Sequence, residues 1–184
     1  MNSLIQPHVR LKFSSTLNSG TTAMYDVITE VPTSEQLKNV RERTGLTQTE
    51  LATIIGINLR NYQLRETCDR ATYPGEYNLL MLLADNHPLY RIKGYTPEKD
   101  AAGITEKLLL AEPEAAEVKR LRKAMGLKLQ EAADRFGYTL SAWKSKEMAS
   151  KRGTLRQAEY NFMLLLLDEH PALKLTNRKA SQVS

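Results

Sequence analysis

The chain has few of the residues that metal sites and disulfide frameworks require. Its 184 residues include a single cysteine, Cys68, and three histidines. One cysteine excludes a disulfide within the chain and is typical of a reducing compartment. The histidines are scattered (His8, His87 and His170), and no Cys/His spacing resembles a metal site. We therefore expect no metal and no cofactor, and we interpret His87 and His170 as favourable partners of helix C-terminal carbonyls.

Long apolar runs are also missing. The two longest, LLMLLA and FMLLLL, have six residues each, whereas a helix needs about 20 apolar residues to span a bilayer. The first residues, MNSLIQPHVRLKF, contain no apolar core typical of a secretory signal. We therefore expect no membrane association and a cytoplasmic location. The sequence has neither a phosphate-binding loop nor a nucleophile elbow, so no enzyme is predicted.

The net charge is mildly positive, at +5, and it is unevenly distributed. Residues 33–92 carry seven Lys/Arg and seven Asp/Glu, whereas residues 112–175 carry twelve and nine. A mild positive excess is compatible with a polyanionic partner but does not require one. The second half of the chain is therefore the more basic half.

The most informative feature of the sequence is an internal repeat. Residues 37–66 align with residues 118–147 at a constant offset of 81, and residues 76–88 align with 159–171 at an offset of 83. A repeat of about 80 residues is too long for a solenoid unit and matches a small domain. Identical pairs include Gly45/Gly126, Leu46/Leu127, Glu50/Glu131, Ala52/Ala133, Gly56/Gly137, Glu66/Glu147 and His87/His170. The sequence therefore predicts two copies of one module.

The repeat divides the chain into five segments, and each module is expected to hold four to five short helices. The segments are an irregular N-terminal arm (1–32), module one (33–92), a linker (93–111), module two (112–175) and a C-terminal tail (176–184). Met24 could serve as an alternative start. Apolar periodicity and caps predict helices near 34–44, 47–55, 59–66 and 76–86, then 113–125, 128–136, 140–147 and 157–169. A further short helix is expected over 107–111 in the linker, and Pro113 is expected at the first position of its helix.

The second and third helices of each module have the spacing of a helix-turn-helix. Ala52 is followed four residues later by Gly56, and Ala133 is followed by Gly137. Two short helices that cross steeply need a small residue at the crossing, and the turn needs a residue that tolerates positive φ. Tyr62 and its counterpart Trp143 are expected to insert the third helix into the core, which leaves the opposite face exposed.

These residues resemble the Cro/phage-repressor (XRE-like) helix-turn-helix family, most clearly in GLTQTELATIIGINLRNYQ. The second copy keeps the frame, although Lys128-Leu129-Gln130-Glu131 replaces the capping box that Thr47 begins. The resemblance implies an all-α fold of two tandem repressor-like helix-turn-helix domains. It also implies sequence-specific binding in the major groove of double-stranded DNA, with nucleoid association as a consequence.

The resemblance further implies which residues contact DNA. The expected base-reading positions are Asn58, Arg60, Asn61 and Gln63 in copy one, and Thr139, Ser141, Ala142 and Lys144 in copy two. The expected phosphate contacts are Thr47, Lys128, Lys144 and Lys146. Gln48 is expected to contact a phosphate or to clamp Gln63. Arginine pairs with guanine, and Asn or Gln with adenine, so the side chains of copy one suit base reading.

We therefore expect a transcriptional regulator, a repressor in preference to an activator, that reads an imperfect repeat through two modules. Several alternatives are left open. Copy two could be a docking module, since Ser141 and Ala142 are small. A homodimer could form through the fourth helices, because residues 157–169 are apolar on nearly all sides and must bury more than one face. A rival function is an antitoxin-like module that masks a protein partner and autoregulates; RNA binding is less favoured.

Overall fold

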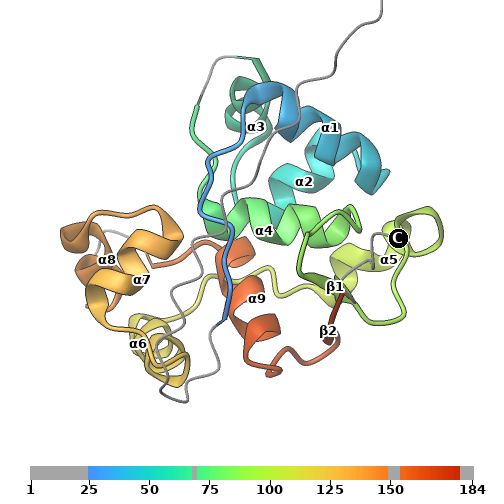
Figure 1. The fold of residues 1–184 in the computed structure, drawn as a ribbon. Coiled ribbons are helices and arrows are strands. Elements are labelled where there is room, and N and C mark those ends of the chain that lie inside the picture. The colour runs from blue at the N-terminus through green and yellow to red at the C-terminus, as the bar shows by residue number, and fades with distance from the viewer. Residues whose placement is uncertain (1–24, 68–69, 149–153, 179–184) are drawn as a thin grey trace, which may run out of the picture.

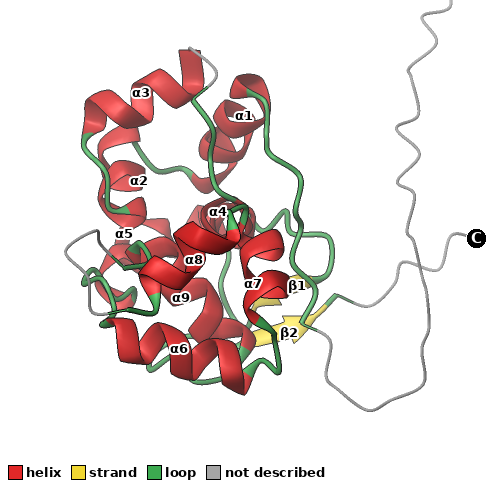
Figure 2. Ribbon diagram, turned by 90° about the vertical axis from the view of Figure 1, so that its left-hand side faces the viewer, coloured by secondary structure: helices red, strands yellow, loops and turns green. Residues whose placement is uncertain are grey.

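The computed structural model describes residues 25–67, 70–148 and 154–178. This part of the chain forms nine helices and one two-stranded antiparallel sheet (Figures 1 and 2). In chain order the elements are α1 (Ser34–Thr44), α2 (Gln48–Ile55), α3 (Leu59–Thr67), α4 (Pro74–Leu83), β1 (Tyr90–Ile92), α5 (Pro97–Lys107), α6 (Ala115–Ala124), α7 (Leu129–Phe136), α8 (Leu140–Lys146), α9 (Gln157–Leu166) and β2 (Leu175–Asn177). The predicted helical class is confirmed, and the strand pair was not foreseen.

The predicted caps set the ends of the early helices. At the start of α2, Glu50 N–H donates to Thr47 Oγ1 over 3.2 Å, and Thr47 N–H donates to Glu50 Oε2 over 2.7 Å. At α7 only half of this arrangement exists, in which Lys128 N–H donates to Glu131 Oε2 over 2.7 Å. Gly56 ends α2 at φ +85°, in the left-handed region that favours glycine. The capping box expected at Thr47 is therefore confirmed.

The linker differs from the sequence-based expectation. Its helix, α5, covers Pro97–Lys107 rather than 107–111, because Pro97 is favoured in the first turn of a helix. Leu109 is not helical, since both its N–H and its C=O bind the side chain of Asn161, over 2.9 and 2.7 Å. Pro113 lies outside α6, which begins at Ala115 with Glu114 as its N-cap. The helix and the proline position expected here were therefore wrong.

The two repeats share one hydrophobic core instead of forming separate domains. Helices α4 and α9 pack against each other at its centre, and all the residues of α4 are buried. Helix α9 is apolar on nearly all sides, and it is largely buried in the same way. One side packs within its own repeat, and another side packs against α4 and α2 of the other repeat. The two helices that left a homodimer open as an alternative are thus already paired within one chain, and a second chain could reach them only by opening this core.

Contacts between the repeats occur in equivalent pairs. A Cβ placed on Gly56 would meet Gln157 at the start of α9, and one placed on Gly137 would meet Pro74 at the start of α4. Gly56 and Gly137 are 81 residues apart, and Pro74 and Gln157 are 83 residues apart. The strand pair obeys the same rule, because Ile92 pairs with Leu175 across an offset of 83. The repeats are therefore related by a pseudo-twofold axis.

A buried asparagine holds the segment before each repeat. Asn78 Oδ1 accepts from Ile28 N–H over 3.0 Å, and Asn78 Nδ2 donates to Ile28 C=O over 2.8 Å and to Pro74 C=O over 2.7 Å. The equivalent residues in the second repeat are Asn161, Leu109 and Gln157. The described part of the expected N-terminal arm is therefore bound to the helices. Tyr25 C=O provides a further contact, because it accepts from Arg135 of α7 over 2.6 Å.

Each asparagine also binds a buried histidine. His87 Nδ1 accepts from the N–H groups of Leu89 and Tyr90, both over 3.2 Å, so its proton lies on Nε2, which is 2.9 Å from Asn78 Oδ1. His170 makes the equivalent contacts with Asn161, Ala172 and Leu173. Burial lowers the pKa of both His87 and His170 to about 4. The expected interaction of charged histidines with helix carbonyls was therefore wrong, because both rings are neutral parts of the core.

These histidines predict a loss of stability in mild acid. The unfolded chain takes up a proton at each histidine as the pH falls below 6.5, but the folded chain does so only near pH 4. At pH 5 this difference costs about 2 kcal/mol for each histidine. Urea unfolding at pH 7 and pH 5 measures the loss. His170→Gln keeps a side-chain donor and is expected to halve the histidine contribution; an unchanged pH dependence would contradict this assignment.

Every helix in the described ranges is too short or too polar to reach across a bilayer.

Candidate nucleic-acid interface

The turn between α2 and α3 presents one face of α3 to solvent. Asn58 caps α3, because its Oδ1 accepts from Asn61 N–H over 2.8 Å. Tyr62 is completely buried and anchors the inner face of the helix in the core, as the sequence predicted. Arg60, two residues before it, is exposed. The α2-turn-α3 unit therefore has a fixed inner face and a polar outer face.

The four base-reading residues predicted in copy one lie together on or beside this outer face. Asn58 and Arg60 are exposed, and Asn61 and Gln63 are half-buried. Asn61 Oδ1 accepts from Arg70 Nη1 over 3.2 Å, which adds a cation that the sequence pattern did not indicate. Nothing in the spacing pointed to Arg70, since it lies beyond the end of α3. Copy one therefore offers guanidinium and amide groups of the kind that read base edges.

A buried acid fixes this face relative to the rest of the module. Glu66 accepts from Arg41 Nε of α1 and from Gln48 Nε2 of α2, both over 2.7 Å. Gln63 Nε2 in turn lies 3.5 Å from Gln48 Oε1. Gln48 thus contacts Gln63, which was one of its two expected roles. Because α1, α2 and α3 all meet at Glu66, the outer face of α3 is held rigidly.

Copy two has the same frame with different side chains. Thr139 Oγ1 accepts from Ala142 N–H over 3.2 Å and caps α8. Trp143 is completely buried, and its Nε1 donates to Glu147 Oε1 over 2.6 Å. Arg122 of α6 binds the same carboxylate, as Arg41 binds Glu66 in copy one. The outer face of α8 then consists of Thr139, Ser141 and Lys144, all exposed, with Ala142 half-buried.

Lys146 does not belong to this face. Its Nζ donates to Thr154 C=O over 2.9 Å and lies 4.3 Å from the centre of the Tyr138 ring. Burial lowers the pKa of Lys146. Its counterpart in copy one, Arg65, also points inward, to Glu76. Both residues are on the core side of the third helix, so we remove Lys146 from the phosphate contacts. The remaining phosphate candidates, Thr47, Lys128 and Lys144, are all exposed.

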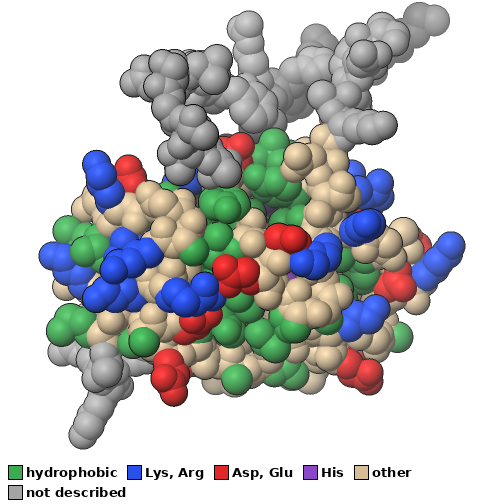
Figure 3. Space-filling model, turned by 90° about the horizontal axis from the view of Figure 1, so that it is seen from below, with side chains coloured by type: hydrophobic (Ala, Val, Ile, Leu, Met, Phe, Trp, Pro, Cys, Tyr) green, Lys and Arg blue, Asp and Glu red, His purple; other side chains and the backbone are tan. Residues whose placement is uncertain are grey.

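The positions of α3 and α8 follow from the pseudo-twofold arrangement. Figure 1 shows α3 at the top and α8 at the left, whereas the strand pair lies at the lower right, and Figure 2 agrees that neither helix adjoins the strands. Figure 3 shows Lys and Arg side chains at the left of the view from below, the side on which α6, α7 and α8 lie, and others at the right. Lys119 and Lys123 of α6 are exposed cations in this half that the sequence pattern did not indicate.

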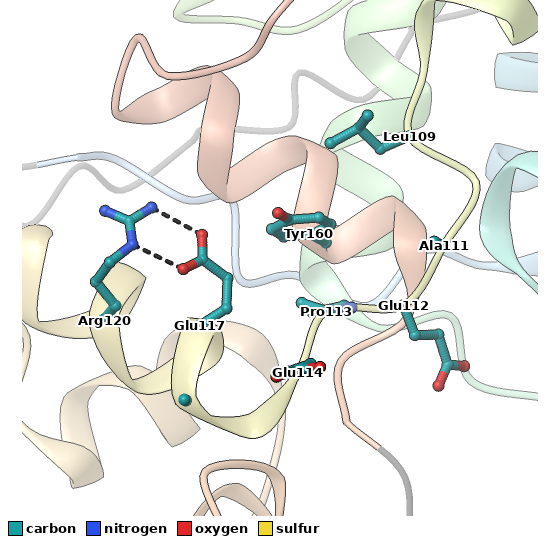
Figure 4. A pocket seen from close by; sticks show the side chains of 9 residues that line it. Leu109, Ala111, Glu112, Pro113, Glu114, Glu117, Arg120 and Tyr160 are labelled. Atoms are coloured by element: carbon teal, nitrogen blue, oxygen red, sulfur yellow. Dashed lines mark hydrogen bonds and ion pairs between the residues drawn. The ribbon is translucent and has the colours of Figure 1, made fainter.

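An open cavity of about 620 Å³ lies between α6 and the start of α9 (Figure 4). Tyr160, Leu109 and Pro113 contribute to its lining, together with an ion pair in which Arg120 Nε lies 2.7 Å from Glu117 Oε2. Arg120 also binds Glu169 over 2.6 Å, so its charge is compensated. No nucleophile and base meet in this lining. Nor do three or more metal-ligating side chains cluster anywhere in residues 25–67, 70–148 and 154–178.

No protein-family model matches this chain, and neither a curated protein nor a solved structure does. The candidate interface is therefore defined by the geometry of the chain itself.

Proposed function

We propose that this protein is a sequence-specific DNA-binding regulator that represses transcription by occupying a promoter. The observation that carries the proposal is the division of α3 into two faces. Tyr62 anchors one face in the core, and the other presents Asn58 and Arg60 to solvent. A short helix held in this way can enter the major groove with its first residues at the base edges.

The rigid support behind α3 favours base reading over loose electrostatic attraction. Glu66 joins the three helices of module one through Arg41 and Gln48. A reading helix must keep its side chains in register with base pairs, and ordered support lowers the entropy lost on binding. The pseudo-twofold arrangement also supports the proposal, because the same chain carries a second helix of this kind, α8. Two such helices on one face of a duplex contact half-sites about 34–36 Å apart.

The proposal predicts a position-specific loss when Arg60 is replaced. Arg60→Ala is expected to weaken binding to the selected sequence by about 1–3 kcal/mol and to relax the preference at a single base pair. DNA selected from a random pool with the parent protein supplies the probe, and titration against single-base variants measures the preference.

The matched control is Lys99→Ala, which removes the same charge from an exposed position on α5. It is expected to leave the base preference and the affinity for the selected site unchanged. If the Arg60 variant lost affinity evenly for every sequence, Arg60 would not be a reading residue. If the parent protein enriched no sequence and instead retained a protein partner from its host, the antitoxin-like alternative would replace this proposal.

A further inference from the structure

The second repeat has gained a lysine at three positions around the helix-turn-helix where the first repeat has no cation. The second repeat has an exposed lysine at each of them, whereas the first has an acid, a hydroxyl and an amide. The lysines are Lys123, Lys128 and Lys144, and the residues at the same positions of the first repeat are Glu42, Thr47 and Gln63. The formal charge at these positions is therefore +3 in the second repeat and −1 in the first. The backbone frame is the same in both.

Two of these lysines flank one tight turn. Lys123 lies in the last turn of α6, and Lys128 is the N-cap of α7. The neighbouring Arg122 donates from Nη1 to Leu127 C=O over 2.7 Å, which ties the end of α6 to the residue before Lys128. Lys128 also adjoins the first amide groups of α7, where the helix dipole favours an anion. The turn therefore carries two exposed lysines, and at the helix start Glu131 Oε2 accepts from Lys128 N–H.

The third lysine is an exposed residue of α8. Lys144 is the counterpart of Gln63, whose amide lies 3.5 Å from Gln48 at the start of α2. In the second repeat the residues at these two positions are Lys144 and Leu129, the first residue of α7. We call Lys123, Lys128 and Lys144 the lysine triad.

At two base-reading positions it is the first repeat, and not the second, that carries the larger polar side chains. Arg60 and Asn61 of the first repeat are replaced by Ser141 and Ala142 in the second. Arginine and asparagine make bidentate hydrogen bonds to guanine and adenine, whereas alanine makes none and serine bonds to several bases alike. The second repeat thus has more charge where phosphates are contacted and has lost the guanidinium and amide groups at these two base-reading positions.

We infer that the two repeats have different roles on DNA. The first reads base edges, and the second binds the phosphate backbone of the adjacent DNA through the lysine triad without reading sequence. This inference rests on the proposed function and deepens it. The ligand of the triad is the backbone of duplex DNA, because regularly spaced phosphates match exposed lysines as point charges. The DNA site bound by one chain therefore has one half-site whose base sequence is recognised and one half-site whose base sequence does not affect binding.

A charge swap between the repeats tests the triad. The variant K123E/K128T/K144Q replaces each lysine of the triad with the residue found at the equivalent position of the first repeat. Each lost phosphate contact lowers the slope of log K against log salt by about 0.9, so three contacts change the ratio of affinities at 50 and 200 mM salt by about 40-fold. The base preference is expected to stay the same. The matched variant R60S/N61A is expected to lose the base preference and to lower the salt slope by no more than about 1.

Selection from random DNA with the full chain separates the outcomes, with thermal melting used to show that each variant is folded. We expect one informative half-site, together with a backbone footprint that extends over the neighbouring half. A selected motif with two equally informative halves would leave the proposed function standing and overturn the separate roles of the repeats. A salt slope unchanged by K123E/K128T/K144Q would also overturn them. Failure of the parent chain to enrich any sequence would overturn the proposed function itself.

Discussion

Replacement of Glu76 by alanine is expected to lower the free energy of unfolding by about 3–5 kcal/mol. Glu76 is completely buried at the junction of the repeats. Its Oε2 accepts from Arg65 Nη1 over 2.7 Å and from Tyr73 N–H over 2.9 Å, and its Oε1 lies 3.1 Å from Arg156 Nη1 of the second repeat. Removal of the carboxylate leaves Arg65 buried without its counter-charge, which costs more than the ion pair contributes when intact.

Glu159, the counterpart of Glu76, supplies the matched control. Its burial and the nearby charge of Glu76 raise the pKa of Glu159. Its Oε2 accepts from Tyr138 Oη–H over 2.8 Å, while its Oε1 has no hydrogen-bond partner within the described part of the chain. Glu159→Gln removes a charge that this environment disfavours, so it is expected to cost less than about 1 kcal/mol.

Urea unfolding of both variants at neutral pH measures this contrast. The sign of the pH effect gives a second readout. A raised pKa in the folded state means that Glu159 contributes stability when protonated and loses that contribution as the pH rises through its folded pKa. Glu159→Gln removes this contribution to the pH dependence. Equal losses for Glu76→Ala and Glu159→Gln would show that the two buried acids have equivalent surroundings, against the contacts described above.

The second large effect is expected at Asn78. Asn78→Ala removes the hydrogen bonds that this side chain makes with Ile28, Pro74 and the His87 ring. Each buried polar group left without a partner costs about 1–3 kcal/mol, so the total loss is expected to reach at least about 3 kcal/mol. The docked segment before α1 should also open, and amide hydrogen exchange at Ile28 measures this directly.

The control for Asn78 is Asn86, an exposed asparagine just beyond the end of α4. Asn86→Ala is expected to change stability by no more than about 0.5 kcal/mol. If Asn78→Ala unfolded at the same urea concentration as the Asn86 variant, the asparagine would not be what holds the preceding segment.

Most of the local structure could be predicted from the sequence because its signals are local. Caps such as Thr47 with Glu50, and glycines such as Gly56, act within a few residues and mark helix ends directly. The burial of Tyr62 and Trp143 also followed from their spacing after a glycine. The exposure of the base-reading candidates is consistent with their predicted role, but their contact with DNA stays a prediction.

The packing of the repeats could not be predicted in the same way. An alignment offset shows which residues are equivalent, but it does not say which of them meet across an interface. The merged core depends on the complementary shapes of α4 and α9, and on glycines that admit Pro74 and Gln157 at close range. One signal was present in the sequence: an asparagine precedes a histidine by nine residues in both copies, at Asn78/His87 and Asn161/His170. A polar pair repeated on an otherwise apolar helix points to a buried hydrogen bond.

Lys146 is the one predicted phosphate contact that the structure places on the inner side of its helix. The resemblance to the helix-turn-helix family implied a phosphate contact for this lysine. Its long side chain instead runs inward, where the Tyr138 ring and the Thr154 carbonyl receive its ammonium group. The buried carboxyl of Glu159 adds a favourable charge nearby. That acid lies on α9, so nothing within α8 itself could reveal it.

Ile92 pairs with Leu175 across two halves that belong to one covalent chain. A repressor assembled from separate subunits must first associate, so its promoter occupancy rises steeply with its concentration. On the proposed function, this chain skips that assembly step, and occupancy follows the first power of its abundance. When a single chain occupies the promoter, the gene under its control would then respond gradually to expression level.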